Sequence, residues 1–283
     1  MATFTNQATL SYNNITRNSN IATGEILETV SATKTAVDTN YSNGQNITYV
    51  VNIVNSGATD LNGLTVTDNL GAYQTQTATA YPLTYVENTA TYFVNGVEQA
   101  RPAATAGPPL AITGINIPAG ANATIVYEAN VNGFAPLASG STIQNTVSVT
   151  GAGLAAPVTA VETLPVNIGP DLQIVKSISP AVVTENGRVT YTFTIQNYGN
   201  NDATTADNAI ITDNFNPVLS DLAVTFNGNT WAENTNYTYT PAGAFATLPN
   251  QITVPAATYT QDPTTGQVTV VPGTSTLTVT GTI

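Results

Sequence analysis

The chain has 283 residues and a net charge of −12, with 42% apolar residues, only 8% charged residues and no cysteine or histidine. Five basic side chains cannot form the face that binding to nucleic acid or anionic lipid requires, and no apolar run approaches the roughly 20 residues that span a bilayer. Without cysteine and histidine, disulfides, thiolate or imidazole metal sites and Ser-His or Cys-His nucleophiles are excluded.

The first segment, residues 1–28, begins without a basic region or an apolar stretch, so no signal peptide is visible in this numbering. Its run FTNQATLSY alternates between apolar and polar residues, as a strand with one buried face does. We expect a donor strand followed by a linker. The apolar face of this strand carries Phe4, Asn6, Ala8 and Leu10.

Residues 29–166 predict a first β-sandwich domain, because strand signals dominate and no helical period is present. The run KTAVDTNYSNGQNITYVVNIVNSGATDLNGLTVTDNL at 34–70 returns as KSISPAVVTENGRVTYTFTIQNYGNNDATTADNAIITDNF at 176–215. In both copies a lysine is followed 15 residues later by a tyrosine, Tyr49 or Tyr191. The sequence therefore predicts an all-β protein with two Ig-like Greek-key sandwich domains.

Residues 167–283 predict a second, incomplete domain of the same type. The first repeat closes with IQNTVSVTG and PVTAVETLPV, whereas the second stops at TSTLTVTGTI, which matches the earlier strand ATIVYEANV. The missing strands match the start of the chain: FTNQATLSY is like IQNTVSV, and GEILETVSATK is like AVETLPV. We expect the N-terminal strand of a neighbouring subunit to complete the second domain. The alternatives are a ring, in which residues 1–28 return to their own second domain, and a disordered tail.

One polar residue interrupts the apolar face of each of six strands. These residues form two equivalent sets in the two repeats: Lys34, Asp68 and Asn145, and Lys176, Asp213 and Asn6. Buried lysine and aspartate are costly unless they are paired or neutral. The simplest interpretation is a buried ion pair with a hydrogen-bonded asparagine. The chain has only two lysines, however, and both occupy the same repeat position.

The functional interpretation is a self-formed isopeptide bond. Burial favours the neutral amine, which is a nucleophile, and a protonated aspartate can polarise the asparagine carbonyl and carry protons. In domain 1 the bond would be intramolecular, from Lys34 to Asn145, with Asp68 as the proton relay. In domain 2 it would be intermolecular, from Lys176 to the neighbour's Asn6, with Asp213 as the relay. Glu128 is a competing acid in domain 1, but its repeat position holds no acid.

The order of these motifs (lysine, G-x-x-[IV]-T-Y, [VI]-x-N-x-G, V-T-D-N-L and Q-N-T-V-S-V) resembles the family called domain of unknown function eleven. These are Ig-like repeats of bacterial and archaeal surface proteins, and the likeness covers 34–149 and 176–283. The residue sets look like those of adhesin and pilin domains with Lys-Asn isopeptides, and the architecture is similar to subunits of ribbon-like clostridial spore appendages. The resemblance implies a subunit of an extracellular, self-assembling fibre on a cell or spore surface.

We therefore expect a head-to-tail homopolymer with no enzymatic activity on other molecules, no cofactor, no metal and no small-molecule substrate. Calcium binding by the loop GNNDATTADN at 199–208 is an alternative, because it is rich in oxygen ligands. A monomeric surface adhesin or carbohydrate-binding stalk module is another. Its stacking residues would be Trp231, Tyr237, Tyr239 and Tyr259.

Overall fold

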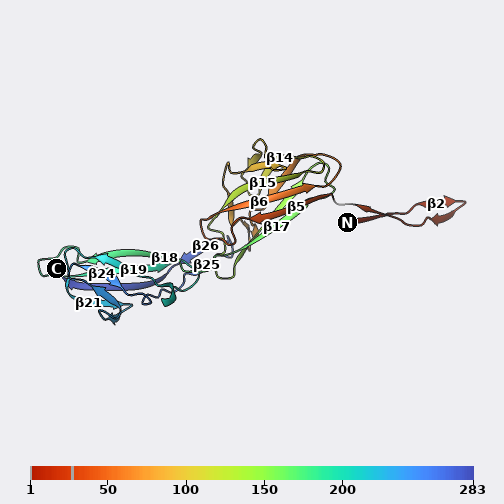
Figure 1. Ribbon diagram of the computed structural model, residues 1–283. Coiled ribbons are helices and arrows are strands. Elements are labelled where there is room, and N and C mark those ends of the chain that lie inside the picture. Colours follow the sequence, from red (N-terminus) through yellow and green to blue (C-terminus); the bar gives the residue numbers. More distant parts are fainter. Residues whose placement is uncertain (1, 27–28) are drawn as a thin grey trace.

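A computed structural model describes residues 2–26 and 29–283, and within them the fold is all-β apart from one 3-10 turn, Thr205–Asp207. Figure 1 shows two elongated sandwiches in line, with a narrow two-stranded ribbon projecting from the first. The predicted fold class, two Ig-like β-sandwich domains, is confirmed. We call the sandwich that follows the ribbon domain 1 and the C-terminal sandwich domain 2.

Domain 1 consists of two facing sheets. One has the order β12-β11-β15-β6-β5, with β10 also paired to β15, and the other has the order β13-β14-β7-β16-β17. Their bounds are β5 (Val30–Ala36), β6 (Asn46–Asn55), β7 (Leu61–Asp68), β10 (Leu83–Tyr85), β11 (Thr91–Val94), β12 (Val97–Glu98), β13 (Ala103–Thr105), β14 (Leu110–Ile117), β15 (Asn122–Val131), β16 (Thr142–Thr150) and β17 (Val158–Pro165). A short hairpin, β8 (Tyr73–Gln74) and β9 (Thr79–Ala80), lies outside both sheets. The long strands bury alternate residues, so their apolar faces form one core.

The last two strands close domain 1. Strand β16 pairs with the edge of β7, β17 pairs with β16, and β17 lies beside β5 of the facing sheet. The core residues Ile143, Val147 and Leu164 come from this pair of strands. These two strands therefore extend the second sheet past β7 and cover the core on the side of β5.

Domain 2 repeats the first sheet but not the second. Its larger sheet has the order β18-β19-β27-β21-β22, and the opposite layer has only β20-β24-β23. The bounds are β18 (Leu172–Ser179), β19 (Arg188–Asn197), β20 (Thr212–Asn214), β21 (Ser220–Phe226), β22 (Asn229–Trp231), β23 (Tyr237–Tyr239), β24 (Ala244–Thr247), β25 (Thr258–Gln261), β26 (Val268–Val271) and β27 (Gly273–Thr282). Strand β20 pairs with β24 as β7 pairs with β14, and none of the strands in the described ranges pairs with its other edge.

This open edge leaves part of the domain 2 core in solvent. Ile174 and Ile178 lie on the inner face of β18 but are 53% and 42% exposed. Their counterparts in domain 1 are at least partly covered, because β17 lies beside β5. Domain 2 therefore lacks the cover that β16 and β17 give to domain 1.

The N-terminal segment folds back on itself as a hairpin, which differs from the expected strand and linker. Strand β1 (Ala2–Asn6) pairs with β4 (Ala22–Ile26), and β2 (Thr9–Tyr12) pairs with β3 (Ile15–Asn18). Asn13 and Asn14 turn the chain with positive φ angles of 46° and 62°, as a tight hairpin turn requires. Figure 1 shows the hairpin pointing away from domain 2, so the ring arrangement is not the one in this structure.

Candidate functional site

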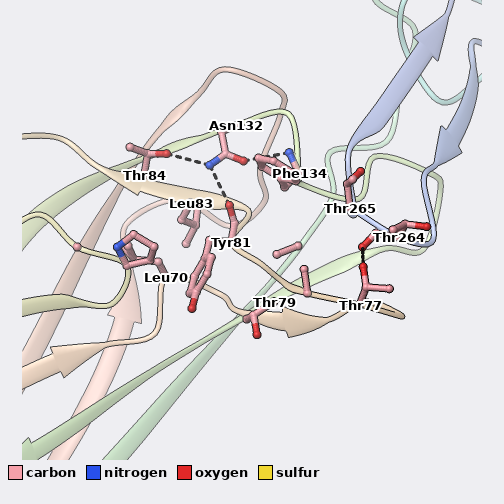
Figure 2. Close-up of a pocket in the computed structure, with 14 residues that line it drawn as sticks. Leu70, Thr77, Thr79, Tyr81, Leu83, Thr84, Asn132, Phe134, Thr264 and Thr265 are labelled. Atoms are coloured by element: carbon pink, nitrogen blue, oxygen red, sulfur yellow. Dashed lines mark hydrogen bonds between the residues drawn. The ribbon is translucent and has the colours of Figure 1, made fainter.

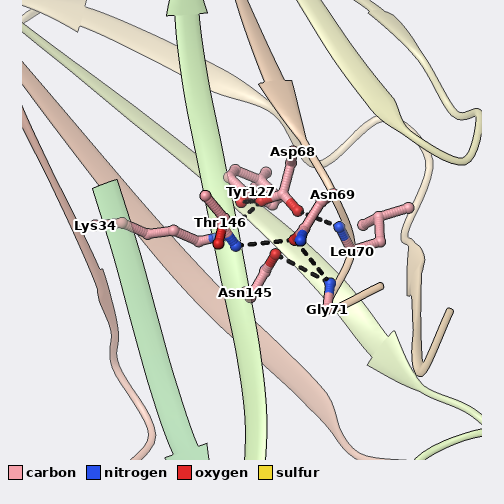
Figure 3. A network of polar contacts seen from close by, with 8 residues as sticks. All are labelled: Lys34, Asp68, Asn69, Leu70, Gly71, Tyr127, Asn145 and Thr146. Carbon is pink, nitrogen blue, oxygen red and sulfur yellow. Dashed lines mark hydrogen bonds and ion pairs between the residues drawn. The ribbon is translucent and has the colours of Figure 1, made fainter. Parts of the chain in front are cut away.

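Three strands of domain 1 bring Lys34, Asp68 and Asn145 together. Lys34 lies on β5, Asp68 ends β7, and Asn145 lies on the neighbouring strand β16. The Lys34 Nζ atom is 2.6 Å from Asp68 Oδ2, and all three residues are buried. In Figure 3 the Lys34 and Asn145 side chains converge on the region of the Asp68 carboxylate. Strand alternation explains the convergence, because each residue lies on the inner face of its strand.

The Asp68 carboxylate is held by donors from three directions. Its Oδ2 atom accepts hydrogen bonds from Lys34 Nζ and from the Tyr127 hydroxyl, and its Oδ1 atom accepts one from the Leu70 backbone N–H at 2.6 Å. Burial raises the pKa of Tyr127 well above its usual value, so this hydroxyl keeps its proton and remains a donor. The carboxylate is thus fixed in orientation beside the amine.

Burial and nearby groups act on the charge of Lys34 in opposite directions. Its Nζ atom lies 4.5 Å from the centre of the Tyr49 ring, a contact that favours the charged amine. Burial lowers the pKa of Lys34 from 10.5 to about 8, although the nearby Asp68 charge acts in the opposite direction. At pH 7 about a tenth of such an amine is neutral, compared with roughly three in ten thousand for a lysine with the ordinary pKa.

The Asn145 amide is held at its oxygen but not at its nitrogen. Its Oδ1 atom accepts a hydrogen bond from the Gly71 N–H at 3.2 Å, and this bond polarises the carbonyl. Its Nδ2 atom is buried without a partner; among the described residues, the only other such side-chain atom is the Tyr49 hydroxyl oxygen. An unsatisfied buried donor of this kind costs about 1–3 kcal/mol. This Nδ2 group is the one that would leave as ammonia if the predicted isopeptide bond between Lys34 and Asn145 formed.

Domain 2 contains two thirds of the same site. Lys176 and Asp213 form an ion pair, and Lys176 Nζ lies 4.5 Å from the centre of the Tyr191 ring, as Lys34 lies over Tyr49. The side chains of Lys176 and Asp213 are, however, 40% and 16% exposed. Sequence patterning predicts that both side chains are buried. They are instead partly exposed, because domain 2 has no strand in the place that β16 takes in domain 1. Asn6, the third predicted member, ends β1, in the hairpin that projects beyond domain 1 (Figure 1).

The two sites differ at one residue that sequence reasoning missed. Tyr49 pairs with Tyr127 across β6 and β15, and the equivalent pair across β19 and β27 is Tyr191 with Val279. Domain 2 thus has no counterpart of the tyrosine that donates to Asp68. The inward position of Tyr127 in the run ATIVYEANV is the signal that could have identified it. The competing acid Glu128 instead accepts a hydrogen bond from Asn46 at 3.3 Å in an exposed position.

The predicted donor residues Phe4, Asn6, Ala8 and Leu10 are exposed on the hairpin. Directly paired residues share a face, so Gly24, the partner of Phe4, lies on this face as well. A side chain at Gly24 would collide with the Phe4 ring, which covers it. The corresponding pair in β16 and β17 is Ile143 with Leu164. Both pairs thus present a large apolar surface on the same face. In domain 1 two side chains, Ile143 and Leu164, form it, and in the hairpin the Phe4 ring alone covers both positions.

Beside the open edge of β20, domain 2 has an apolar groove of about 170 Å³. It lies between the start of β18 and the chain leading into β20. Its apolar lining residues are Leu172, Ile174, Ile195, Ala209, Ile211 and Ile252, together with Ile210.

The residues named for other functions have structural contacts. Trp231 stacks on Phe226, Tyr237 is buried, and the Tyr239 and Tyr259 hydroxyls bind backbone groups. In the loop 199–208, Asp202 accepts from the Ala256 N–H and Asp207 from the Thr204 N–H.

No group of three or more possible metal-ligating side chains is found in the described part of the chain. Within 2–26 and 29–283, no helix has the length and apolarity to cross a membrane.

No protein-family model matches the chain, so the resemblances to domain of unknown function eleven and to clostridial spore appendages are not confirmed. No curated protein matches it at a significant level. Among solved structures, the chain is similar to a variant of the major pilin subunit of Bacillus cereus (11% identity, TM-score 0.38, covering 96% of this chain and 73% of that one). It is also similar to a 35 kDa C-terminal fragment of the major pilin of Streptococcus agalactiae (13%, 0.36, 87% and 91%) and to the collagen-binding domain of a Staphylococcus aureus adhesin (13%, 0.31, 50% and 99%). Nothing about function follows from likenesses this loose.

Proposed function

We propose that this protein is the structural subunit of an extracellular fibre that assembles head to tail, with the N-terminal hairpin of one copy completing domain 2 of the next. One observation carries the proposal. Domain 2 lacks two closing strands, and the same chain bears an unpartnered two-stranded hairpin with an apolar face. Sheet edges and apolar faces left open in this way are satisfied by strand addition.

The repeat sets the register of docking. In domain 1, β16 places Val147 opposite Asp68 and Val149 opposite Val66. Aligning Asn6 with Asn145 puts Ala8 opposite Asp213 and Leu10 opposite Ile211. Strands β1 and β2 then take the place of β16 beside β20, and β3 and β4 take the place of β17 beside β18. In this register Asn6 enters the site that already contains Lys176 and Asp213.

The same register directs Leu10 to the apolar groove of domain 2. Leu10 is 63% exposed on the free hairpin, and the groove is lined by Ile174 and Ile211 among other apolar residues. A volume of about 170 Å³ is sufficient for one leucine side chain. Burial of this apolar surface supplies a driving force for docking that does not depend on the covalent step.

In domain 1 the chemistry is an amide exchange. Lys34 passes a proton to Asp68, and the neutral Nζ atom attacks Cγ of Asn145, whose oxygen is polarised by the Gly71 N–H. Asp68 gives this proton to Nδ2 and takes a second proton from Nζ as the Cγ–Nδ2 bond breaks, so the departing nitrogen leaves as neutral ammonia and Asp68 ends protonated. One Nζ–Cγ bond forms and one ammonia leaves, so β5 and β16 become covalently joined.

In domain 2 the same exchange joins Lys176 to the Asn6 of the neighbouring copy, with Asp213 as the relay. Until the hairpin docks, the Lys176 side chain is 40% exposed and the Asn6 amide that it would join lies on another copy. Docking of the hairpin covers the Lys176 amine and at the same time brings the Asn6 amide beside it. The covalent bond therefore forms only after non-covalent docking, because the docked strand supplies the amide.

Denaturing electrophoresis of boiled fibres tests the proposal. The wild-type chain should give a ladder of multimers without reductant. Lys176→Ala and Asn6→Ala should each abolish the ladder, whereas Lys34→Ala, if it folds, should retain it. Deletion of residues 1–26 should give monomers. Fibres formed by the deleted chain would disprove donation by the hairpin, and a ladder that survives both single substitutions would disprove the assigned bond.

A further inference from the structure

The two domains of one chain are joined by a clamp of two short hairpins, β8–β9 from domain 1 and β25–β26 from domain 2. The Tyr73 hydroxyl lies 3.1 Å from the Gly266 carbonyl oxygen and accepts a hydrogen bond from Gln261 Nε2 at 2.6 Å. The Gln76 N–H donates to the Pro263 carbonyl at 2.9 Å, and the Val268 N–H donates to the Gly133 carbonyl at 2.8 Å. These bonds connect backbone and side chains of both domains.

Side chains add to the clamp. The Thr75 and Thr77 hydroxyls both donate to the Thr264 carbonyl, at 2.7 and 3.0 Å, and Figure 2 shows Thr77 and Thr264 in contact. Apolar side chains of β25 and β26 pack against the core of domain 1; they are Tyr259, Val268 and Val270. Hydrogen bonds together with apolar burial restrict the angle between the domains more strongly than a single linker can.

The domain 2 half of the clamp is an insertion relative to domain 1. Asn55 Nδ2 donates to the Ile117 carbonyl, and the equivalent Asn197 Nδ2 lies 3.4 Å from the Val254 carbonyl oxygen, so Ile117 and Val254 correspond. From there domain 1 reaches its next long strand through the short turn 118–121. Domain 2 reaches its own through 255–272, which contains β25 and β26.

The domain 1 half is an insertion as well. Leu70 and Phe215 correspond, since each follows the T-D-N run of its repeat. Leu83 and Leu219 correspond, because the residue after each pairs at the same point of β15 and β27. Domain 1 spans the interval with residues 71–82, including β8 and β9, and domain 2 spans it with residues 216–218.

We propose that the fibre alternates two kinds of joint, a clamped joint inside each subunit and a hinge between subunits. This inference rests on the proposed assembly. A docked hairpin takes the place of β16–β17, the strands that lead from domain 1 into domain 2 within one chain. The junction between domain 2 of one copy and domain 1 of the next is therefore equivalent to the junction between domains 1 and 2 of a single chain. At that junction domain 1 offers only the turn 118–121 and domain 2 only residues 216–218. Neither half of the clamp is present there.

The monomer gives the first test. Because the natural chain has no cysteine, pairs of introduced cysteines can carry spin labels without further changes. Labels at Val97 and Asn229 span the clamped joint, and labels at Val97 and Thr16 span the joint to the hairpin. Pulsed electron resonance should give a narrow distance distribution for the first pair and a broad one for the second. Equal widths would overturn the proposal.

A deletion identifies the clamp as the cause. Replacing residues 256–272 by Ala-Gly, the corresponding pair of domain 1, should broaden the distribution between Val97 and Asn229. If that variant does not fold, Tyr73→Phe with Thr75→Ala removes side-chain bonds of the clamp and should broaden the distribution to a smaller extent. An unchanged width in a folded deletion variant would overturn the proposal.

Fibres provide the second test. Electron micrographs of wild-type fibres should show bending at every second joint, and the deletion variant should bend at all joints. Fibres that bend equally at both joints in the wild type would contradict the alternation. Failure to form fibres would contradict the proposed assembly instead, and the monomer distances would still decide whether the clamp restrains the two domains.

Discussion

Truncating Leu10 tests whether the groove of domain 2 receives the hairpin. Leu10→Ala removes three carbon atoms, worth about 2.4 kcal/mol when fully buried at ~0.8 kcal/mol for each methylene. Because 63% of Leu10 is exposed on the free hairpin, docking should recover about 1.5 kcal/mol of this amount. That free energy corresponds to a roughly tenfold weaker association.

The assay needs assembly without the covalent step. In an Asn6→Ala background, the concentration above which fibres form measures the non-covalent affinity, and it should rise about tenfold with Leu10→Ala. Thr5→Ala is the matched control, since Thr5 lies on the opposite face of the hairpin and is exposed. A critical concentration that Leu10→Ala leaves unchanged, or that Thr5→Ala raises equally, would refute the register.

Four further results are expected in domain 1. Closure uses a proton that stays within the pair of Lys34 and Asp68, and burial lowers the pKa of Lys34 to about 8. Refolded chains should therefore close the internal bond at a constant rate up to pH 8 and about tenfold more slowly for each pH unit above it, as followed by intact mass. In the unbonded Asn145→Ala variant, stability against urea should rise between pH 8 and 10.5, because over that range the unfolded lysine still binds a proton that the folded one has released. Lys34→Met leaves Asp68 buried without its cation and should cost about 3–5 kcal/mol beyond the loss of the bond, measured against Asn145→Ala. Tyr127→Phe removes a hydrogen bond to the Asp68 carboxylate, worth about 1.5–3 kcal/mol, so it should slow closure of the internal bond about tenfold or more. The ladder of multimers should remain, because domain 2 already has Val279 at the position of Tyr127.

The repeat and the two-residue period of strands were enough to place Lys34, Asp68 and Asn145 on inner faces and to indicate which strands were missing. The same reasoning placed Lys176 in a core. Strand periodicity reports which way a side chain points, but not whether another strand covers it. Lys176 is 40% exposed because domain 2 lacks the strand that would cover it.

Other features depend on contacts that leave no periodic signal. The Asn13-Asn14 pair between alternating runs was a visible hairpin signal, because asparagine tolerates positive φ, and it identifies β3 and β4 as the second strand of the donor. By contrast, the bond between Tyr73 and Gly266 joins two insertions 193 residues apart. No local pattern in either insertion specifies the other, so the clamp could be found only in the structure.

Peptide mass analysis of digested fibres tests the covalent junction between subunits. We expect one cross-linked pair in which the peptide containing Lys176 is joined to the peptide containing Asn6, at a mass one ammonia below their sum. The linked pair should be absent from monomers that have not assembled. If both peptides are recovered from fibres only in unlinked, unmodified form, the covalent junction between subunits does not exist.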